Sequence, residues 1–291
     1  MGKFSKALEK SADQPGPKMS RITSGPEPGQ PAEENTSGRE QTSPAPEPAA
    51  DFVRERWDRR LQLSADPKSE YFESFRRLRS SIVYPASGSP PKTLLVTSTV
   101  PHEGKGFVCA NLGVALARGM EHHAMMVDCD FRNPTLAGLF GLSNETGLAD
   151  HLREQADLSL LIRKTGQPKL SLLASGQPPK NPAEMLSSTR MAALIDEMAE
   201  RYPDRIVLFD SPPDVIASET SVLAKRIDGV ILVVRYGASK KEDIKKFVEA
   251  LGREKIYGVV FNAFPENTME DFLDRRMGHG YGYHRYSYKG Y

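Results

Sequence analysis

The feature that most constrains the fold of this chain is a short apolar run that breaks into a loop ending in Gly104-Lys105. Residues 93–97 are apolar or β-branched, which predicts a buried strand, and apolar residues recur at helical spacing over residues 107–118. Between such a strand and helix, backbone N–H groups can bind phosphate while the lysine reaches its outer oxygens. The stretch therefore predicts a phosphate-binding loop, or P-loop. Its candidate nucleotide-contacting residues are Pro101, His102, Glu103, Gly104, Lys105, Gly106 and Phe107.

Two positions of this loop depart from the usual P-loop pattern, G-x-x-x-x-G-K-[ST]. Gly106 stands where Ser or Thr would supply a hydroxyl to Mg²⁺, and Thr99 stands where the first glycine is expected. A Gly-Lys turn formed by chance is the alternative interpretation, and the rest of the chain has to decide between the two.

Two further apolar runs end in carboxylates. Asp128 and Asp130 follow the run that starts at residue 123, and Asp210 ends the run over residues 206–210. In open α/β sheets, the carboxyl ends of buried strands line the crevice where ligands bind. Asp210 fits the aspartate that orients the hydration shell of Mg²⁺ near the phosphates. Asp128 and Asp130 are candidate site residues as well, and a turn aspartate is the alternative for Asp128.

The rest of the chain alternates strand-like and helix-like segments, which predicts an α/β fold with a doubly wound, mainly parallel sheet of the P-loop NTPase type. The further expected segments are strands over 170–174, 230–234 and 256–261, a helix that opens at Asn181-Pro182, and a helix over 240–251.

Two short polar segments follow strand ends. Asn133 or Thr135 is expected to cap a short helix that runs through Leu139. Asn262, just past the last expected strand, could contact the base of a nucleotide, or could simply form a turn.

The two ends of the chain differ in composition from its middle. With 291 residues, of which 38% are hydrophobic, the chain can bury one sizeable core beside disordered segments. Residues 11–50 are rich in Pro, Gly, Ser, Glu and Gln, so order is expected to begin near Asp66 to Ser69. The predicted division is a mostly disordered N-terminal segment (1–66), a P-loop domain (67–265) and a flexible Tyr-rich tail (266–291).

Charge and hydropathy exclude several classes of protein. The formal net charge of +1 provides no general field for nucleic acid or an anionic membrane, so no nucleic-acid partner is expected. No apolar run approaches the ~18 residues of a membrane span, and the N-terminus carries no export or lipid signal. We therefore expect a cytoplasmic protein. Its two cysteines, Cys109 and Cys129, are expected to be reduced and buried, with a redox pair as the alternative.

A helix expected over residues 70–84 has two different faces. Tyr71, Phe75, Leu78 and Ile82 share one face, and Glu73 lies on the opposite face with two arginines. The charged face is either a solvated, salt-bridged surface or a contact surface for a second subunit.

The C-terminal tail is dominated by tyrosines that alternate with Gly, Ser and basic residues. Base stacking on RNA is one explanation, and metal binding by His279 and His284 is another. A cluster of phosphate acceptors explains the tyrosines best, because a flexible tail can reach an active site on its own or a neighbouring subunit. The candidate acceptors are Tyr281, Tyr283, Tyr286, Tyr288 and Tyr291.

Taken together, these motifs resemble the bacterial tyrosine kinase family, the BY-kinases, in the form of a separate cytoplasmic protein tied to exopolysaccharide export. The resemblance runs from about residue 70 to the C-terminus. It rests on the P-loop, on the tyrosine cluster, and on three spaced motifs: Glu73-x-x-Arg76-x-x-Arg79, similar to the family's oligomerisation motif, Asp128-x-Asp130-x-Arg132 (Walker A′) and Asp210-x-x-Pro213 (Walker B).

The resemblance implies an ATP- and Mg²⁺-dependent protein-tyrosine autokinase that regulates exopolysaccharide polymerisation and export. Lys105 would neutralise charge on the transferred phosphoryl group, and Asp210 would hold Mg²⁺. Asp128 would assist the metal or activate the tyrosine hydroxyl, with support from Asp130.

The same resemblance implies partners. Glu73, Arg76 and Arg79 would join copies of the chain in a homo-oligomeric ring, and the tail tyrosines would be phosphorylated between subunits. A membrane chain-length-determining adaptor would recruit the protein to the inner face of the membrane.

Two other functions compete with this interpretation. Family members usually show P-G-E-G-K-[ST], so His102 and Gly106 suggest a nucleotide-binding scaffold or pseudokinase with weak or no autophosphorylation. A partitioning-type ATPase shares the expected fold, but it normally carries a second lysine where Val100 stands here.

Overall fold

The fold is built on one seven-stranded sheet with the strand order β3-β4-β2-β5-β1-β6-β7. The computed structural model describes residues 54–263 except 155, 202–203 and 214–218. Neighbouring strands pair in parallel, apart from the antiparallel pair β3 and β4. The predicted doubly wound, mainly parallel α/β fold is confirmed. The strands are β1 (Thr93–Ser98), β2 (His123–Asp128), β3 (Ile162–Lys164), β4 (Leu170–Leu173), β5 (Arg205–Asp210), β6 (Gly229–Arg235) and β7 (Ile256–Asn262).

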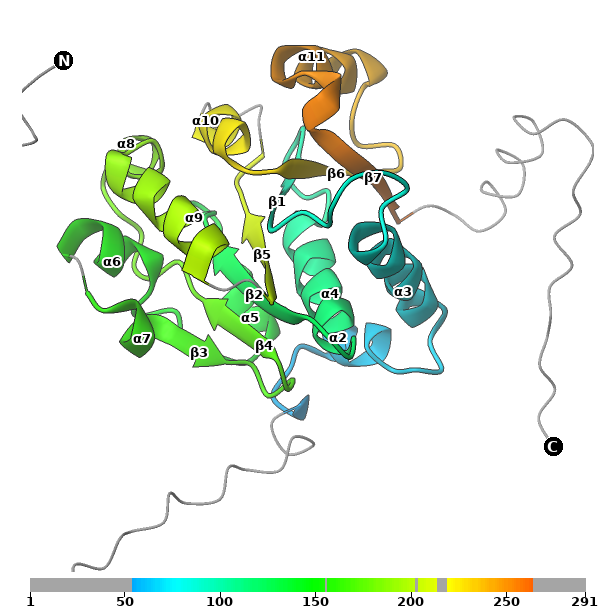
Figure 1. Cartoon of the computed structure of the whole chain (residues 1–291), viewed down its shortest axis with the longest axis horizontal. Helices are drawn as coiled ribbons and strands as arrows, with labels where there is room; N and C mark the ends of the chain where they lie inside the picture. The colour runs from blue at the N-terminus through cyan, green and yellow to red at the C-terminus, as the bar shows by residue number, and fades with distance from the viewer. Residues whose placement is uncertain (1–53, 155, 202–203, 214–218, 264–291) are drawn as a thin grey trace, which may run out of the picture. The chain divides into compact units, whose positions relative to one another are not determined.

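Helices cover both faces of this sheet and bury two apolar layers (Figure 1). One layer lies beneath α2 (Arg59–Ser64), α3 (Glu70–Val83), α4 (Lys105–Ala117) and α5 (Leu136–Leu139). The other lies beneath α6 (Leu148–Glu154), α7 (Leu158–Leu161), α8 (Pro182–Leu186), α9 (Thr189–Arg201), α10 (Glu219–Arg226) and α11 (Lys241–Leu251), which the 3-10 turn η2 (Arg253–Lys255) follows.

Strand β1 and helix α4 occupy the centre of the molecule. Every residue of β1 is buried, because β5 and β6 flank it and helices cover both of its faces. Leu95 therefore packs in one apolar layer while Leu94 and Val96 pack in the other. Helix α4 is buried all round except at Phe107, since α3 packs on the side that the sheet leaves open. The loop between β1 and α4 is thereby held by the two most buried elements of the fold.

Ordered structure begins earlier than the sequence indicates. The expectation that order starts near Asp66 is wrong, because α2 and the preceding Trp57 are part of the core. The Trp57 ring meets Phe140 edge to face at 5.1 Å, and its Nε1 donates to the carbonyl oxygen of Thr165 at 2.9 Å. No sequence pattern indicates this start, because the segment is short and reaches its partners only in the folded chain. Residues 1–53 and the tail from 264 onward, with all five candidate acceptor tyrosines, lie outside the described residues.

A second difference concerns the helix expected from Asn181-Pro182 onward. It is divided into α8 and α9 at Ser188. The Ser188 hydroxyl accepts the N–H of Met191 at 3.2 Å, which is the hydrogen bond of an N-terminal cap. Ser188 therefore starts a second helix within an apolar pattern that predicted a single continuous helix.

Two further expectations concern the cysteines and the membrane. Cys109 and Cys129 are free and buried, as expected, one in each apolar layer. Within the residues that the structure describes, no helix combines the length and the apolar character that crossing a membrane requires.

Candidate functional site

The predicted P-loop lies where expected, between β1 and α4. Gly104 caps α4 in the left-handed conformation, with φ of 89°. A Cβ at this position would overlap the side-chain amide of Asn262, which donates to the carbonyl oxygen of Glu103 at 2.8 Å. Glycine is therefore required here both for its conformation and for the close approach of β7. The end of β7 lies directly against the loop, so Asn262 is part of the site.

The Glu103 side chain does not point toward the predicted phosphate site. It is fully buried, and its carboxylate accepts the N–H groups of Thr99 (3.0 Å) and Val100 (3.2 Å). It also accepts the N–H of Arg235 (3.1 Å) and the hydroxyl of Ser239 (2.8 Å). Hydrogen bonds to a carboxylate are among the strong ones. Glu103 thus ties the P-loop to the segment that follows β6.

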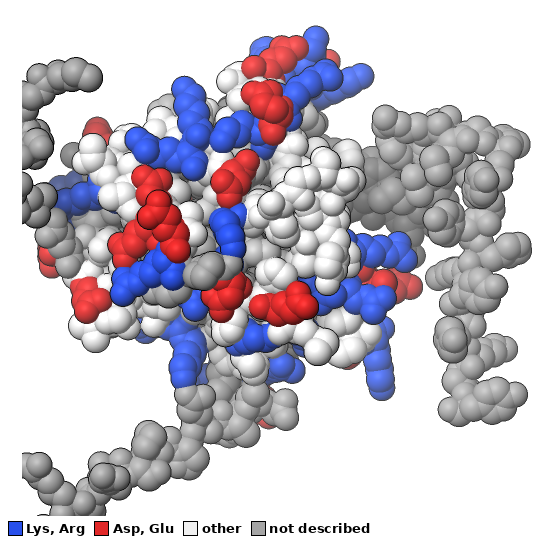
Figure 2. Space-filling model, viewed as in Figure 1, with Lys and Arg blue, Asp and Glu red and all other residues white. Residues whose placement is uncertain are grey.

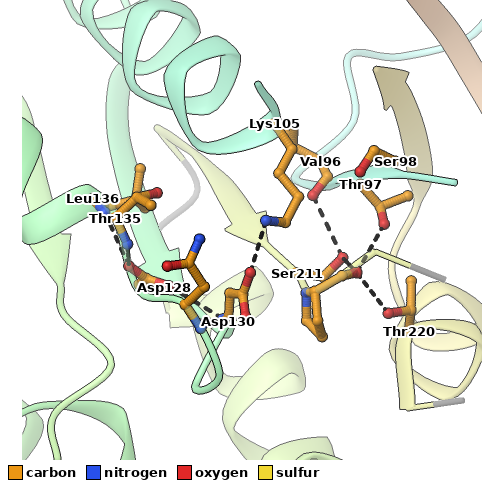
Figure 3. A network of polar contacts seen from close by, with 12 residues as sticks. Val96, Thr97, Ser98, Lys105, Asp128, Asp130, Thr135, Leu136, Ser211 and Thr220 are labelled. Atoms are coloured by element: carbon orange, nitrogen blue, oxygen red, sulfur yellow. Dashed lines mark hydrogen bonds and ion pairs between the residues drawn. The ribbon is translucent and has the colours of Figure 1, made fainter. Parts of the chain in front are cut away.

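Lys105 opens α4 and is buried. Its side chain points toward Asp130, as Figure 3 shows. Its Nζ lies 2.7 Å from Oδ2 of Asp130, with 10% and 2% of the two side chains exposed. Burial works to lower the pKa of Lys105, but the charges of Asp210 and Asp130 outweigh it and raise that pKa above its usual value. The lysine is therefore a fixed cation at the start of the helix.

Asp128 organises the loop after β2. Its Oδ1 accepts the N–H of Asp130 at 3.2 Å, and its Oδ2 accepts those of Thr135 and Leu136 at 3.1 and 3.0 Å. Burial raises the pKa of Asp128 to about 7. The short helix expected to run through Leu139 is confirmed as α5, and Thr135 is its N-cap residue. The Thr135 side chain makes no capping hydrogen bond, and Asp128 accepts the N–H groups of Thr135 and Leu136 instead.

Asp210 lies opposite Asp128 in the pairing of β5 with β2. Both of its carboxylate oxygens are buried, and neither has a hydrogen-bond partner among the described residues. Burial raises the pKa of Asp210 well above its usual range. A buried carboxylate without partners calls for an explanation, and a cation with its waters is one, because Mg²⁺ prefers oxygen ligands. Asp210 therefore fits a metal-binding role.

A cleft of about 450 Å³ opens over the P-loop. Among the predicted nucleotide-contacting residues, His102, Gly104, Lys105, Gly106, Phe107 and Asn262 line it. Pro101 does not line it, and Glu103 points away from it. The sequence interpretation missed Arg60, Arg235 and, as a site residue, Thr135, which line it too. No local pattern marks these residues, because α2, β6 and the loop after β2 meet there only in three dimensions.

The candidate oligomerisation residues lie on α3. Glu73 and Arg76 form an exposed ion pair at 3.0 Å, whereas Arg79 donates to the carbonyl oxygen of Ala115 on α4 at 3.4 Å. An exposed pair of this kind contributes little to stability. On the face drawn in Figure 2, basic side chains are interspersed with acidic ones, in keeping with the small net charge.

A parallel sheet with a lysine-bearing loop and carboxylates at its strand ends defines a P-loop nucleotide-binding protein. No family model matches the chain. It is 32% identical to the tyrosine-protein kinase YwqD of Bacillus subtilis (strain 168), over 71% of this chain and 87% of the relative. It is 30% identical to the putative tyrosine-protein kinase CapB of Staphylococcus aureus, over 70% and 90%. The chain spans only 29% of the putative tyrosine-protein kinase EpsB of Ralstonia nicotianae (strain ATCC BAA-1114 / GMI1000), at 33% identity over 77% of this chain.

Solved structures agree. The chimerical protein CapA2B2 matches with a TM-score of 0.64 and 33% identity, over 71% of this chain and 90% of that one. The kinase domain of the Escherichia coli tyrosine kinase ETK matches with a TM-score of 0.63 and 28% identity, over 69% and 78%. This chain belongs to the bacterial tyrosine-protein kinase family, and its enzyme class is that of the protein-tyrosine kinases.

Proposed function

We propose that this protein is an ATP- and Mg²⁺-dependent tyrosine autokinase whose acceptors are Tyr281, Tyr283, Tyr286, Tyr288 and Tyr291. The observation that carries the proposal is the fixed cation of Lys105 in the cleft, beside the buried Asp210 carboxylate that has no hydrogen-bond partner among the described residues. Phosphoryl transfer requires mainly positioning and charge neutralisation, and this arrangement can supply both. Family membership supports the same reaction.

In the proposed reaction, the tyrosine oxygen forms a bond to the γ-phosphorus of ATP as the bond from that phosphorus to the β–γ bridging oxygen breaks, and ADP leaves. Lys105 and the N–H groups at the start of α4 would hold the phosphates. Asp210 would hold Mg²⁺, which would neutralise phosphate charge when bound. Asp128 accepts the phenolic proton as the general base. Asp130 keeps Lys105 in position.

The proposal is tested by incubating the purified chain with Mg-ATP and measuring phosphotyrosine and intact mass. Wild type is expected to gain phosphoryl groups. Lys105→Met is expected to lose roughly 95% of the phosphotyrosine signal or more, because the removal of one charge-stabilising group slows a reaction by at least that much. Lys241→Met, at an exposed lysine that opens α11, is the matched control and is expected to retain activity. Equal signals from wild type and Lys105→Met would refute the proposal.

By family resemblance, we further propose that the kinase regulates exopolysaccharide polymerisation and export from the inner face of the membrane, where a chain-length-determining adaptor recruits it.

Copies of the chain would form a ring through Glu73, Arg76 and Arg79. Sedimentation of the wild type against the triple alanine variant tests the ring. An unchanged sedimentation coefficient in the variant would count against it. The predicted boundary at residue 266 stays a prediction, whereas the boundary at residue 67 moves toward the N-terminus, because α2 precedes it.

A second candidate function is favoured by one observation, the missing hydroxyl at Gly106. A scaffold or pseudokinase of the same machinery would bind nucleotide without efficient autophosphorylation. Gly106→Ser in a Thr135→Ala background separates the two functions, because a side chain at position 106 would otherwise overlap the Thr135 hydroxyl. A large gain in phosphotyrosine from near zero supports the scaffold, and little change supports the kinase.

A further inference from the structure

The position that Gly106 leaves without a side chain is filled by another residue. Gly106 is the second residue of α4 and faces the loop after β2. A Cβ built on Gly106 would overlap Oγ1 of Thr135 and would lie 3.0 Å from Oδ2 of Asp210. The Thr135 hydroxyl therefore occupies the volume from which a serine or threonine side chain at position 106 would extend.

The Thr135 hydroxyl makes no hydrogen bond within the described structure. Oγ1 of Thr135 is buried and has no hydrogen-bond partner among the described residues, and the same holds for both carboxylate oxygens of Asp210. Thr135 does not cap α5 with its side chain, because Asp128 binds the N–H groups there. Buried polar atoms are almost always satisfied, so two neighbouring groups without partners point to a shared ligand.

The chemistry of these groups selects the ligand. A neutral hydroxyl beside a carboxylate is the pair of oxygen donors that Mg²⁺ takes in phosphate-binding loops. The Lys105 ammonium does not satisfy them, since its nearest ion-pair partner is Asp130 at 2.7 Å. The backbone of Thr135 is also fixed, because its N–H donates to the buried Asp128 at 3.1 Å.

We propose that Thr135 supplies, from the loop after β2, the hydroxyl ligand for the divalent cation that the P-loop lacks at Gly106. The inference rests on the proposed nucleotide site and concerns how that site holds its metal. Glycine at position 106 then does not deprive the site of a hydroxyl ligand, because Thr135 supplies that ligand from another loop.

The first test measures ADP affinity calorimetrically with Mg²⁺ and with EDTA. Wild type is expected to bind ADP more tightly with Mg²⁺. Thr135→Val keeps the shape and removes the hydroxyl, so it is expected to lose about tenfold in affinity with Mg²⁺ and to match wild type in EDTA. Thr135→Ser keeps the hydroxyl and is expected to retain the effect of Mg²⁺. A full Mg²⁺ effect in Thr135→Val overturns the inference.

The second test returns the hydroxyl to its usual place. In Thr135→Ala the overlapping oxygen is gone, and the Cβ of residue 135 would lie 3.4 Å from a new Cβ at position 106, an ordinary contact. The double variant Gly106→Ser/Thr135→Ala is expected to recover the Mg²⁺ effect that Thr135→Ala loses. A double variant as defective as Thr135→Ala overturns the inference.

The two proposals fail in different ways. A wild-type protein that binds no ADP in either buffer refutes the nucleotide site, and this inference with it. A wild type that binds ADP more tightly with Mg²⁺, beside a Thr135→Val variant that does the same, refutes only the role of Thr135.

Discussion

At the scale of single residues, two paired carboxylates behave differently because of their surroundings. Asp128 and Asp210 lie opposite each other at the ends of β2 and β5, and both are buried. Asp128 accepts three backbone N–H groups, whereas Asp210 accepts none from the described residues. The Asp128 carboxylate therefore holds the loop after β2 in place beside its proposed role as base, and the Asp210 carboxylate keeps both oxygens available for a metal ion.

The raised pKa of Asp128 predicts a pH dependence of stability for the nucleotide-free protein. The carboxyl has a pKa of 3.8 when unfolded and about 7 when folded, so between these values the folded state binds more protons. The free energy of unfolding should therefore fall as the pH rises from about 4 to 7, and Asp128→Asn should reduce this fall by about 1 to 4 kcal/mol. Urea titrations of both proteins across this range measure it. Parallel pH profiles for the two would contradict the prediction.

Much of the site could be predicted at this scale, and the reason is local. Lys105, Asp128 and Asp210 stand at the ends of apolar runs, so the rule that parallel strands end at one edge of a sheet brings them together. Nothing in the sequence around Thr135 or Arg235 shows that they line the same cleft, because their place depends on contacts between distant segments. The same is true of the carboxylate of Glu103, whose partners include the last residue of β6 and Ser239 beyond it.

At the scale of elements, α2 acts as a strap across the layer formed by α4 and α5. Leu61 and Trp57 are buried against that layer, and Arg60 reaches the cleft. The strap was missed because six helical residues carry too little periodicity to stand out in the sequence.

Removal of the strap's anchor should destabilise the whole fold. Trp57→Ala deletes a buried ring and its hydrogen bond to Thr165, so it is expected to lower the free energy of unfolding by about 3 to 5 kcal/mol. Leu63→Ala, in α2 but 59% exposed, is the control and should change the free energy of unfolding by about 0.5 kcal/mol or less. Chemical denaturation gives both values. Equal losses in the two variants would show that α2 is not anchored as described.

The tie between the P-loop and the segment after β6 makes a separate prediction. Glu103→Gln keeps the size of the side chain but places an amide NH₂ among N–H donors, so it should lower the free energy of unfolding by about 2 kcal/mol and weaken ADP binding. Glu242→Gln, in the exposed first turn of α11, is the control and should do neither. Thermal denaturation and calorimetry measure the two effects. Normal ADP affinity in Glu103→Gln would mean that the loop holds its shape without this carboxylate.

At the scale of the whole molecule, the sheet separates two apolar layers. The alternation of strands and helices along the chain is enough to predict this layered arrangement. Alternating strands and helices predicted the doubly wound sheet, since parallel strands need helical crossovers. The sequence did not predict the order of the strands or the start of the folded part, because both depend on packing between segments far apart in the chain.

The two cysteines report on the two layers separately. Burial raises the pKa of both Cys109 and Cys129 well above the usual value, and each lies in a different layer. Neither thiol should react with a disulfide reagent in the native protein at pH 7, and both should react once the chain is unfolded. Labelling of Cys109→Ala and of Cys129→Ala then shows which thiol, and so which apolar layer, accounts for each labelling rate. Fast labelling of the native protein would show that a layer opens locally.

The end of β7 has a kinetic consequence. Asn262 is bonded to the P-loop, and Ala263, the last residue of the described segment, lines the cleft. The tyrosine-bearing continuation of the chain is thus tethered at the mouth of the site. A tethered acceptor meets a site at an effective concentration set by the length of its tether and not by the abundance of the protein. In the proposed kinase, a free peptide substrate would have to compete with acceptors that never diffuse away.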